Sequence, residues 1–360
     1  MSSKETIIIL SPGFPESESD STCLPMQQQF VRTLKEMYPQ FEIVVLTFQY
    51  PYHRTEYKWF DIKVIPFGGR NRGGLQKLLL RNKVNSTLKR LYRGRKIAGV
   101  FSFWYNECAF VGKKFADKFD IKHYCWLLGQ DARKGNRYPS LLQPRSNELV
   151  ALSDFIQNEF EKNHRIKPQF VIPPGIDNEL FDTSPTEKDI DILAVGSLIP
   201  LKQYNIFLEI VAEIKKQIPG VKASLVGKGP EKERLQSVIN NFQLENNVTM
   251  TGELPYNEVL KLMQRAKVFL HTSSYEGFGC VCLEALYAGA HVISFCRPMN
   301  IDIPHWHIAK TGEEMTNESL RVLHDPLVRY LSVCRYTISD SVKQVMNLFA
   351  VSQEIIEKAD

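Results

Sequence analysis

The sequence predicts an α/β protein with two domains, each built on a parallel β-sheet. The chain has 360 residues, enough for two domains of ordinary size that each bury a core. A strand–loop–helix–strand pattern opens the chain at residues 6–47 and appears again at residues 267–295. Between these halves, residues 183–188 are polar and contain a proline, as is typical of a domain boundary. The expected segments are a first domain at 1–182, a second domain at 183–345 and a C-terminal helical segment at 346–360.

The composition indicates a globular protein of a reducing compartment. Hydrophobic residues make up 43% of the chain and charged residues 24%, which is ordinary for a soluble protein. The first residues show no charged stretch followed by a long apolar run, and no apolar stretch approaches the roughly 20 residues needed to cross a bilayer. The seven cysteines are scattered and odd in number, which suits the cytosol. We therefore expect a cytoplasmic protein.

The first domain begins with a buried type of strand at residues 6–10, followed by a loop rich in Pro, Ser and Gly. Ligands of parallel α/β domains bind at the carboxyl ends of the strands. Gly13, in this loop, is therefore a candidate contact for a phosphate. Ser153 or Asp154 is expected to cap a helix at 154–163. The other elements expected here are helices at 27–37 and 75–92 and strands at 41–47, 59–66, 97–103, 123–128, 149–153 and 170–174.

One region accounts for the basic charge of the chain. The net charge is +5, yet residues 62–106 contain eleven Lys and Arg and no acidic residue, which leaves 34 basic and 40 acidic residues elsewhere. Residues 75–92 have apolar side chains at helical spacing with Lys and Arg between them. Two readings stay open for residues 70–96: a basic helix that binds an anionic membrane surface or an anionic acceptor, or a solvated helix that packs its leucines on the core. Nucleic-acid binding is not expected, because the region has few aromatic residues and no known module.

The stretch at residues 267–293 carries the clearest sign of a ligand site. It predicts a strand, a turn at 273–279 and a helix from Cys280. Backbone amides at a helix N-terminus and the positive end of the helix dipole suit the phosphates of a nucleotide. Gly277 and Gly279 lack a β-carbon, so a ligand can approach the backbone closely.

Two carboxylates frame this turn. Glu284 lies about 7 Å along the helix axis, a suitable reach from a phosphate to the hydroxyls of an attached ribose. Glu276, at the end of the strand, faces whatever lies beyond the phosphates, such as a sugar. Carboxylates are good acceptors for hydroxyl groups. The plainer alternative is a helix-capping Glu276 and a satisfied surface Glu284.

The pattern E-G-F-G-x-x-x-x-E-A, residues 276–285, followed by Gly289 and a strand, resembles the nucleotide-sugar signature of retaining glycosyltransferases of the GT-B fold, glycosyltransferase family 4 (glycosyl transferases group 1). The resemblance is densest across residues 171–295. It implies two Rossmann-like domains that face each other across a cleft, with the acceptor on the first domain and the nucleotide sugar on the second. It also implies that the last helix crosses back to the first domain.

The resemblance assigns roles to single residues. Glu276 is expected to hold the donor sugar and Glu284 the ribose, while Lys202 grips the diphosphate. Lys202 and Glu276 are the expected catalytic residues. The remaining expected donor contacts are Gly13, Gly196, Ser197, Gly227, Gly277, Phe278, Gly279 and Cys280.

The chain departs from the family pattern at two positions. The strand that commonly ends in His-Gly-x-Asp has Leu128 at the histidine position, before Gly129 and Asp131. His123 lies five residues earlier, inside the strand, and does not replace it. Ser197 stands where the family commonly has Arg. The pair Asp189 and Asp191 matches the metal-binding Asp-x-Asp of a different glycosyltransferase fold, but it leads into a strand and is read as a polar strand start.

The expected reaction moves a sugar from a nucleotide-diphosphate sugar to a hydroxyl acceptor with retention at the anomeric carbon. The resemblance implies neither a metal nor another cofactor. The expected acceptor is a glycan or a lipid-linked molecule, as in polysaccharide or glycolipid biosynthesis, on a cytoplasmic enzyme that associates peripherally with the inner membrane face. Two alternatives stay open: a nucleotide-sugar epimerase of the same fold, and a catalytically silent nucleotide-sugar-binding protein.

Overall fold

The computed structural model describes residues 4–182, 184 and 186–350, which divide into two compact units. The N-terminal unit runs to Pro174 and includes the chain again from Ile338, and the C-terminal unit is Gly175–Thr337. The division therefore falls before the expected boundary at residue 183. Its physical reason is that Ile176 pairs with Thr337 and donates its N–H to the carbonyl of Tyr336 (3.1 Å), so the chain enters and leaves the C-terminal unit side by side.

The N-terminal unit contains an eight-stranded sheet in the order β3-β4-β2-β1-β5-β6-β7-β8. All neighbouring strands are parallel except β3 and β4. The chain starts in the middle of the sheet at β1, builds outward through β2 and β4, and then reverses through β5, so the strand order changes direction between β1 and β5. The strands are β1 (Thr6–Gly13), β2 (Glu42–Tyr50), β3 (Tyr57–Trp59), β4 (Ile62–Pro66), β5 (Ile97–Phe103), β6 (His123–Leu127), β7 (Leu149–Ala151) and β8 (Phe170–Val171).

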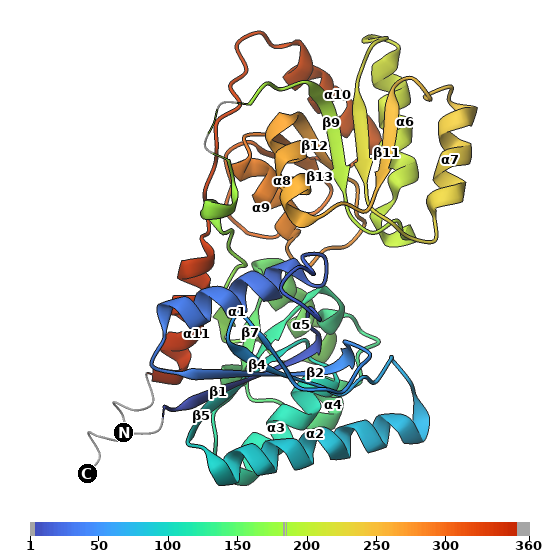
Figure 1. The fold of residues 1–360 in the computed structure, drawn as a ribbon. Helices are drawn as coiled ribbons and strands as arrows, with labels where there is room; N and C mark the ends of the chain where they lie inside the picture. Colours follow the sequence, from blue (N-terminus) through green and yellow to red (C-terminus); the bar gives the residue numbers. More distant parts are fainter. Residues whose placement is uncertain (1–3, 183, 185, 351–360) are drawn as a thin grey trace. The chain divides into compact units, whose positions relative to one another are not determined.

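Helices cover both faces of this sheet (Figure 1). Helices α2 and α3 bury their apolar faces on one side, against residues such as Leu10 and Val44. On the other side, α1 contributes Phe30, which stacks on Phe101. The Ser153 side chain caps α5 by accepting from the Ile156 amide (3.1 Å), as the sequence predicts. The helices are α1 (Pro25–Met37), α2 (Gly74–Gly94), α3 (Glu107–Phe119), α4 (Tyr138–Leu142), α5 (Asp154–His164) and α11 (Ile338–Ala350).

The C-terminal helix α11 packs on the N-terminal unit beside α1 (Figure 1). Phe349 occupies the space above Gly99, where a β-carbon would lie only 2.2 Å from the ring. Tyr124 donates its hydroxyl to the carbonyl of Leu348 (2.8 Å), and Lys122 binds the carbonyl of Phe349. The helix spans Ile338–Ala350, so the predicted C-terminal segment at 346–360 begins inside it, and residues 351–360 lie outside the described residues.

Helix α2 packs on the core along most of its length and exposes apolar side chains at its first turns. Four apolar residues, Leu80, Val84, Leu88 and Leu91, are buried in the core, so most of the helix is an ordinary packing element. At its first turns, however, Leu75, Leu78 and Leu79 are 71%, 52% and 49% exposed. The basic charge is also less free than the sequence suggests, because six of the eleven basic side chains pair with carboxylates: Lys63, Lys77, Arg81, Arg90, Arg95 and Lys96.

The C-terminal unit contains a six-stranded parallel sheet in the order β11-β10-β9-β12-β13-β14. Counted along the chain within this unit, the order is 3-2-1-4-5-6, that of a Rossmann sheet. The strand order reverses between β9 and β12, and this reversal marks where ligands of such sheets bind. The strands are β9 (Ile190–Val195), β10 (Ala223–Val226), β11 (Val248–Gly252), β12 (Ala266–His271), β13 (His291–Ser294) and β14 (Trp306–Ile308).

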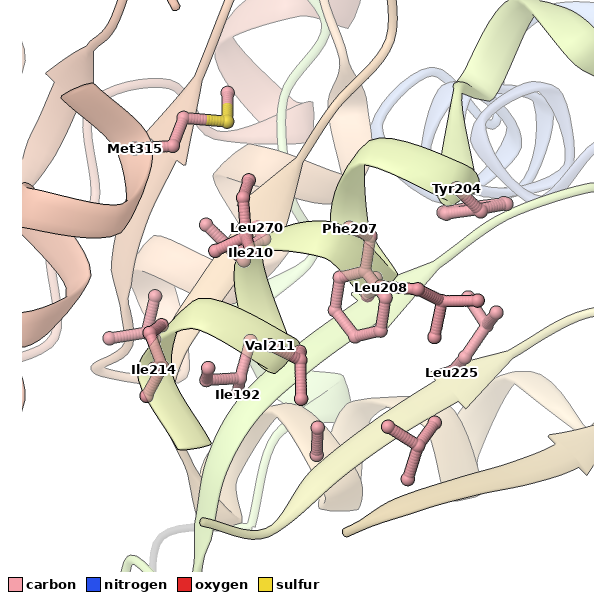
Figure 2. Packing of buried hydrophobic residues seen from close by; sticks show 14 of the residues in the cluster. Ile192, Tyr204, Phe207, Leu208, Ile210, Val211, Ile214, Leu225, Leu270 and Met315 are labelled. Carbon is pink, nitrogen blue, oxygen red and sulfur yellow. The ribbon is translucent and has the colours of Figure 1, made fainter. Parts of the chain in front are cut away.

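A hydrophobic core fixes the helices of this unit on the sheet. Figure 2 shows Phe207 and Val211 of α6 directed toward Ile192 of the sheet. Helices α7 and α10 extend the same core through Leu235 and Met315. Burying such side chains contributes roughly 1.5–3 kcal/mol each. The helices are α6 (Tyr204–Lys215), α7 (Lys232–Asn241), α8 (Tyr256–Arg265), α9 (Cys280–Tyr287) and α10 (Gly312–His324).

Two loops at the carboxyl edge of this sheet touch backbone to backbone. A β-carbon on Gly227 would lie 1.9 Å from the carbonyl oxygen of Gly196, and Gly227 has a φ of +146°. Two residues further along the same loop, a β-carbon on Gly229 would lie 2.4 Å from the carbonyl oxygen of Leu198. The loop after β9 is therefore held directly against the loop after β10, and only glycine permits this approach.

We predict that Gly227→Ala lowers the stability of the C-terminal unit by about 2–3 kcal/mol, because the added methyl group meets backbone rather than a movable side chain. Gly220→Ala is the matched control: nothing lies within 4 Å of its added β-carbon. Urea unfolding should show a lower midpoint for the first variant and a nearly unchanged midpoint for the second. Equal midpoints would contradict the close approach of the two loops.

Candidate functional site

The candidate site lies in the C-terminal unit, where the strand order reverses between β9 and β12. Three of the sequence-predicted residues come together there from separate elements. Lys202 follows β9, Glu276 follows β12, and Glu284 lies on α9. This edge of the sheet therefore supplies one cation and two carboxylates.

Lys202 is positioned by hydrogen bonds that join the loops after β9 and β12. It ends a short 3-10 turn, Pro200–Lys202. Thr272 donates its hydroxyl to the carbonyl of Lys202 (2.7 Å), and Ser274 donates its N–H to the carbonyl of Leu201 (3.1 Å). The backbone under Lys202 is thus fixed by the same loop that carries Glu276.

The Lys202 ammonium group forms an ion pair with the carboxylate of Glu276. Both side chains are 18% exposed, so the pair is largely shielded from water yet open on one side. Burial opposes ionisation of Glu276, but the hydrogen bond from His271 and the charge of Lys202 outweigh it and lower the pKa of Glu276 to about 2. Glu276 is therefore an anion over the whole physiological range.

His271 is a site residue that the sequence reading missed. It is the last residue of β12, it is buried, and its Nε2 lies 3.5 Å from the Glu276 carboxylate. Burial lowers the pKa of His271, so the neutral ring donates from Nε2 and orients Glu276 without adding charge. The only sequence signal was a polar residue at the end of an apolar strand, FLHTSS. We assigned this histidine to the strand and did not consider it as a site residue.

Glu284 has a different environment from Glu276. It lies half-buried on α9 and accepts a hydrogen bond from the hydroxyl of Tyr256 on α8 (2.7 Å). Desolvation raises the pKa of Glu284 to about 7, and the hydrogen bond from Tyr256 offsets only part of this effect. Near neutral pH this carboxyl group exists in both protonation states. Tyr256 was also not predicted, since a tyrosine at the start of a helix is not a distinctive signal.

The predicted donor-binding turn, residues 277–280, leads directly into α9. Gly279 precedes the helix with a φ of +80°, the left-handed conformation that glycine favours. The Phe278 side chain is buried and packs edge-on against Trp306 and Tyr336, so it fixes the turn rather than lining its open side. Gly277 and Cys280 lie on either side, and burial raises the pKa of the Cys280 thiol, which is therefore unreactive.

The other predicted donor contacts fall into two groups. Gly196 and Gly227 lie beside Lys202 in the C-terminal unit, and their role in the structure is the close loop contact described above. Ser197 is exposed in the same loop. Gly13 ends β1 of the N-terminal unit, where a β-carbon would make only ordinary contacts of 3.6–3.8 Å.

Leu128 and His123, the two residues considered at the family's histidine position, have clear positions. Leu128 directly follows β6, where the resemblance expects a histidine. His123 is buried at the opposite end of that strand, 2.8 Å from the Ser102 hydroxyl, and takes no part at the carboxyl edge. At the start of α3, the Glu107 carboxylate pairs with Lys77 and Arg81 and accepts a hydrogen bond from the Tyr138 hydroxyl.

The Asp189 and Asp191 carboxylates are occupied by ion pairs. Asp189 forms a two-pronged pair with Arg265 (2.8 and 2.6 Å), and Asp191 pairs with Lys267 (2.8 Å). Within residues 4–182, 184 and 186–350, no group of three or more His, Cys, Asp or Glu side chains could hold a metal ion. Over the same described part of the chain, no helix is both long and apolar enough to cross a membrane.

Comparison with solved structures identifies the fold. TarM superposes with a TM-score of 0.71 over 96% of this chain and 98% of that one, at 12% identity. Anabaena HepE, solved in complex with UDP-glucose, superposes with a TM-score of 0.67 over 98% of this chain and 99% of that one, at 18% identity. The fold is that of the GT-B glycosyltransferases. These likenesses concern the fold alone.

Sequence comparison gives a partial match to one family. Residues 176–304 match the model of glycosyl transferases group 1, a segment that contains Lys202, Glu276 and Glu284. The chain is 25% identical to an uncharacterized glycosyltransferase of Methanocaldococcus jannaschii over 74% of this chain and 73% of that one. It is 30% identical to a putative colanic acid biosynthesis glycosyltransferase of Escherichia coli over 42% of this chain and 39% of that one. Several other relatives are also matched over less than half of their own length.

The contrasting pKa values of Glu284 and Glu276 predict opposite effects of removing their charges. The folded-state pKa of Glu284 is raised above 4.5, so its ionisation destabilises the fold as the pH rises from about 4.5 through 7. The folded-state pKa of Glu276 is lowered below 4.5, so its charge stabilises the fold above pH 4.5, and that contribution is lost as the pH falls toward 2.

We therefore expect Glu284→Gln to raise the melting temperature at pH 8 and to change it little at pH 5. Glu276→Gln should lower the melting temperature at both pH values, because Lys202 loses its partner. Thermal melts of the two variants and the unmodified protein at pH 5 and 8 measure this. A Glu284→Gln variant that melts lower at pH 8 would show that the Glu284 charge is not costly.

Proposed function

We propose that this protein is a glycosyltransferase that moves a sugar from a nucleotide-diphosphate sugar to a hydroxyl acceptor with retention at the anomeric carbon. The observation that carries the proposal is the Lys202–Glu276 ion pair at the point where the strand order of a Rossmann sheet reverses. The similarity of residues 176–304 to glycosyl transferases group 1 supports it. UDP is the first nucleotide to test, because Anabaena HepE was solved with UDP-glucose.

In this proposal the donor replaces the ion pair between Lys202 and Glu276. Lys202 and Glu276 satisfy each other while the site is empty of donor, which keeps two partly buried charges compensated. When the donor binds, Lys202 turns to the diphosphate and Glu276 is released to accept hydrogen bonds from the sugar hydroxyls. The donor therefore replaces one set of charge contacts with another, and neither group is left unpaired.

In this proposal Lys202 provides the main electrostatic stabilisation of the departing diphosphate. Negative charge grows on the diphosphate as the bond to the sugar breaks, and a fixed ammonium group stabilises that charge more in the transition state than in the bound donor. Turn amides at residues 277–280 assist as neutral donors. No metal is required in this scheme, because Lys202 supplies the positive charge.

Glu276 and Glu284 orient the donor. Glu276, released from Lys202 and still oriented by His271, binds the sugar, and Glu284 binds the ribose hydroxyls. Because accepting from two hydroxyls favours the carboxylate form, donor binding should lower the pKa of Glu284 and release a proton below pH 7. Such positioning lowers the entropic part of the barrier.

The second candidate is a nucleotide-sugar-binding protein without transferase activity. The observation that favours it is Leu128, an apolar residue at the position where the resemblance expects histidine. Both candidates require the same donor site, so donor binding does not separate them. Detection of a glycosylated product with any acceptor eliminates the silent protein, as does release of UDP that depends on an added acceptor.

We predict that UDP raises the melting temperature of the unmodified protein and not that of Glu284→Ala or Lys202→Ala. A ligand at a hundred times its dissociation constant adds about 2.7 kcal/mol to the free energy of unfolding. The matched control is Lys216→Ala, which breaks an exposed ion pair with Glu213 in the same unit and should keep the full shift. UDP, GDP and ADP, each with its common sugars, form the screen. Equal shifts in all variants would contradict the site, and the absence of any shift would contradict the proposed function.

The proposal extends to the acceptor side through α2. Its exposed Leu75, Leu78 and Leu79 share one face, and Arg70 and Arg72 nearby have no carboxylate within 4 Å among the described residues. Leucines that enter the interface and arginines that attract anionic headgroups together suit a peripheral association with an anionic bilayer. A lipid-linked acceptor would be reached in that position.

We expect the protein to sediment with vesicles that contain 40% phosphatidylglycerol and not with pure phosphatidylcholine vesicles. Leu78→Glu combined with Leu79→Glu should abolish binding, because two charges replace the inserted side chains. Leu327→Glu, at an exposed leucine of the C-terminal unit, is the control and should bind normally. Failure of the unmodified protein to bind anionic vesicles would end the membrane part of the proposal.

A further inference from the structure

The turn between β5 and α3 in the N-terminal unit contains a strained tryptophan. Trp104 has a φ of +68°, in the left-handed region that bulky side chains rarely adopt. It directly follows Phe103, the last residue of β5. Residues held in such conformations persist only where the surrounding structure fixes them, and they are concentrated at binding sites.

Hydrogen bonds on both sides fix this turn. The Trp104 N–H donates to the carbonyl of Trp126 on β6 (3.1 Å), and the Asn136 side chain donates to the carbonyl of Tyr105 (3.0 Å). The buried Asp131 carboxylate accepts from the backbone amides of both Tyr105 and Leu128. Asp131, the acidic residue of the Gly-x-Asp sequence after β6, therefore joins the turn at Trp104 to the position where the resemblance expects histidine.

Tyr105 and Asn106 have structural roles in this turn, whereas Trp104 has none that its contacts show. Tyr105 is buried against Phe160, and Asn106 caps α3 through the Cys108 amide (2.9 Å). Trp104 is half-buried, and its indole has no hydrogen bond or ring contact with any of the described residues. The strained residue therefore lies at the carboxyl end of β5, and no hydrogen bond or ring contact of its indole among the described residues accounts for the strain.

The location of Trp104 agrees with a ligand role. It follows β5 at the point where the strand order of the N-terminal sheet reverses between β1 and β5, which is where ligands of such sheets bind. Leu128, also half-buried, lies beside it, because Asp131 binds the backbone of both segments. Both residues are apolar, and they follow neighbouring strands, β5 and β6, at this edge of the sheet.

We propose that Trp104 and Leu128 bind the apolar face of a sugar ring of the acceptor. This inference rests on the proposed function and specifies it: the acceptor carries a carbohydrate at the position that receives the new bond. A rigid indole buries a flat ring face at little entropic cost, and a sugar ring has such a face, formed by its C–H bonds. A flexible lipid chain gains less from one rigid plane. Leucine in place of histidine extends the apolar surface instead of adding a polar group.

The test measures transfer from UDP-glucose and UDP-N-acetylglucosamine to methyl glycosides of glucose, galactose, mannose and N-acetylglucosamine, by UDP release. Trp104→Ala and Trp104→Gly should each raise the KM for the glycoside about tenfold. Trp104→Phe should keep most of the affinity. The KM for the donor and the thermal shift produced by UDP should not change in any of them, because Trp104 lies in the other unit from Lys202 and Glu284.

The backbone strain at Trp104 can be tested by melting temperatures, independently of activity. Glycine accepts a positive φ and alanine does not, so Trp104→Gly should melt about 2–4 °C above Trp104→Ala. The reverse order would contradict the strained turn.

Three further outcomes decide the inference. An unchanged glycoside KM in Trp104→Ala would overturn it, and so would an unmodified protein that binds UDP yet transfers to none of the glycosides. A protein that responds to no nucleotide would instead remove the proposed function, and this inference with it.

Discussion

The ion pair between Lys202 and Glu276 is the interaction on which the candidate site depends. It joins the loop after β9 to the loop after β12, the two neighbouring strands at which the sheet order reverses. Hydrogen bonds from Thr272 and Ser274 to the Pro200–Lys202 turn fix the backbone that carries Lys202. Its charges are compensated but not sealed from solvent, so a ligand with a diphosphate and hydroxyl groups can exchange with both partners.

Two glutamates eight residues apart in the sequence behave differently because their surroundings differ. Glu276 has a cation and a histidine donor within reach, and its pKa falls to about 2. Glu284 accepts a hydrogen bond from the Tyr256 hydroxyl but has no cation beside it among the described residues, and desolvation raises its pKa to about 7. One carboxylate is therefore a permanent charge that can orient a sugar. The other is kept close to neutral at a cost that a ribose with two hydroxyl donors would recover.

Much of the fold followed from the sequence, because parallel sheets have clear local signals. The predicted strand at 97–103 matches β5 residue for residue, and Ser153 caps α5 as expected. The unit boundary did not follow. The polar segment at 183–188 resembles a linker, whereas the pairing of Ile176 with Thr337 joins residues 161 positions apart and leaves no local trace.

The candidate site was predictable only where a motif marks it. Lys202, Glu276 and Glu284 came from spacing and resemblance, and the structure brings them to one edge of the sheet. His271 and Tyr256 were missed, because each acts through one side-chain contact that spacing does not encode. The free charge of residues 70–96 was overestimated, because the carboxylate partners of Lys77, Arg90 and Arg95 lie far away in the sequence.

The most direct measurement is an experimental structure of the protein with UDP bound. The account predicts that the ribose hydroxyls lie within about 3.2 Å of the Glu284 carboxylate. It also predicts that the Lys202 ammonium group contacts the diphosphate and no longer Glu276. UDP bound at any other place, such as the groove lined by Ile206, Glu213, Phe242 and Thr316 between α6 and α10, or bound here with the Lys202–Glu276 pair intact, would contradict the account.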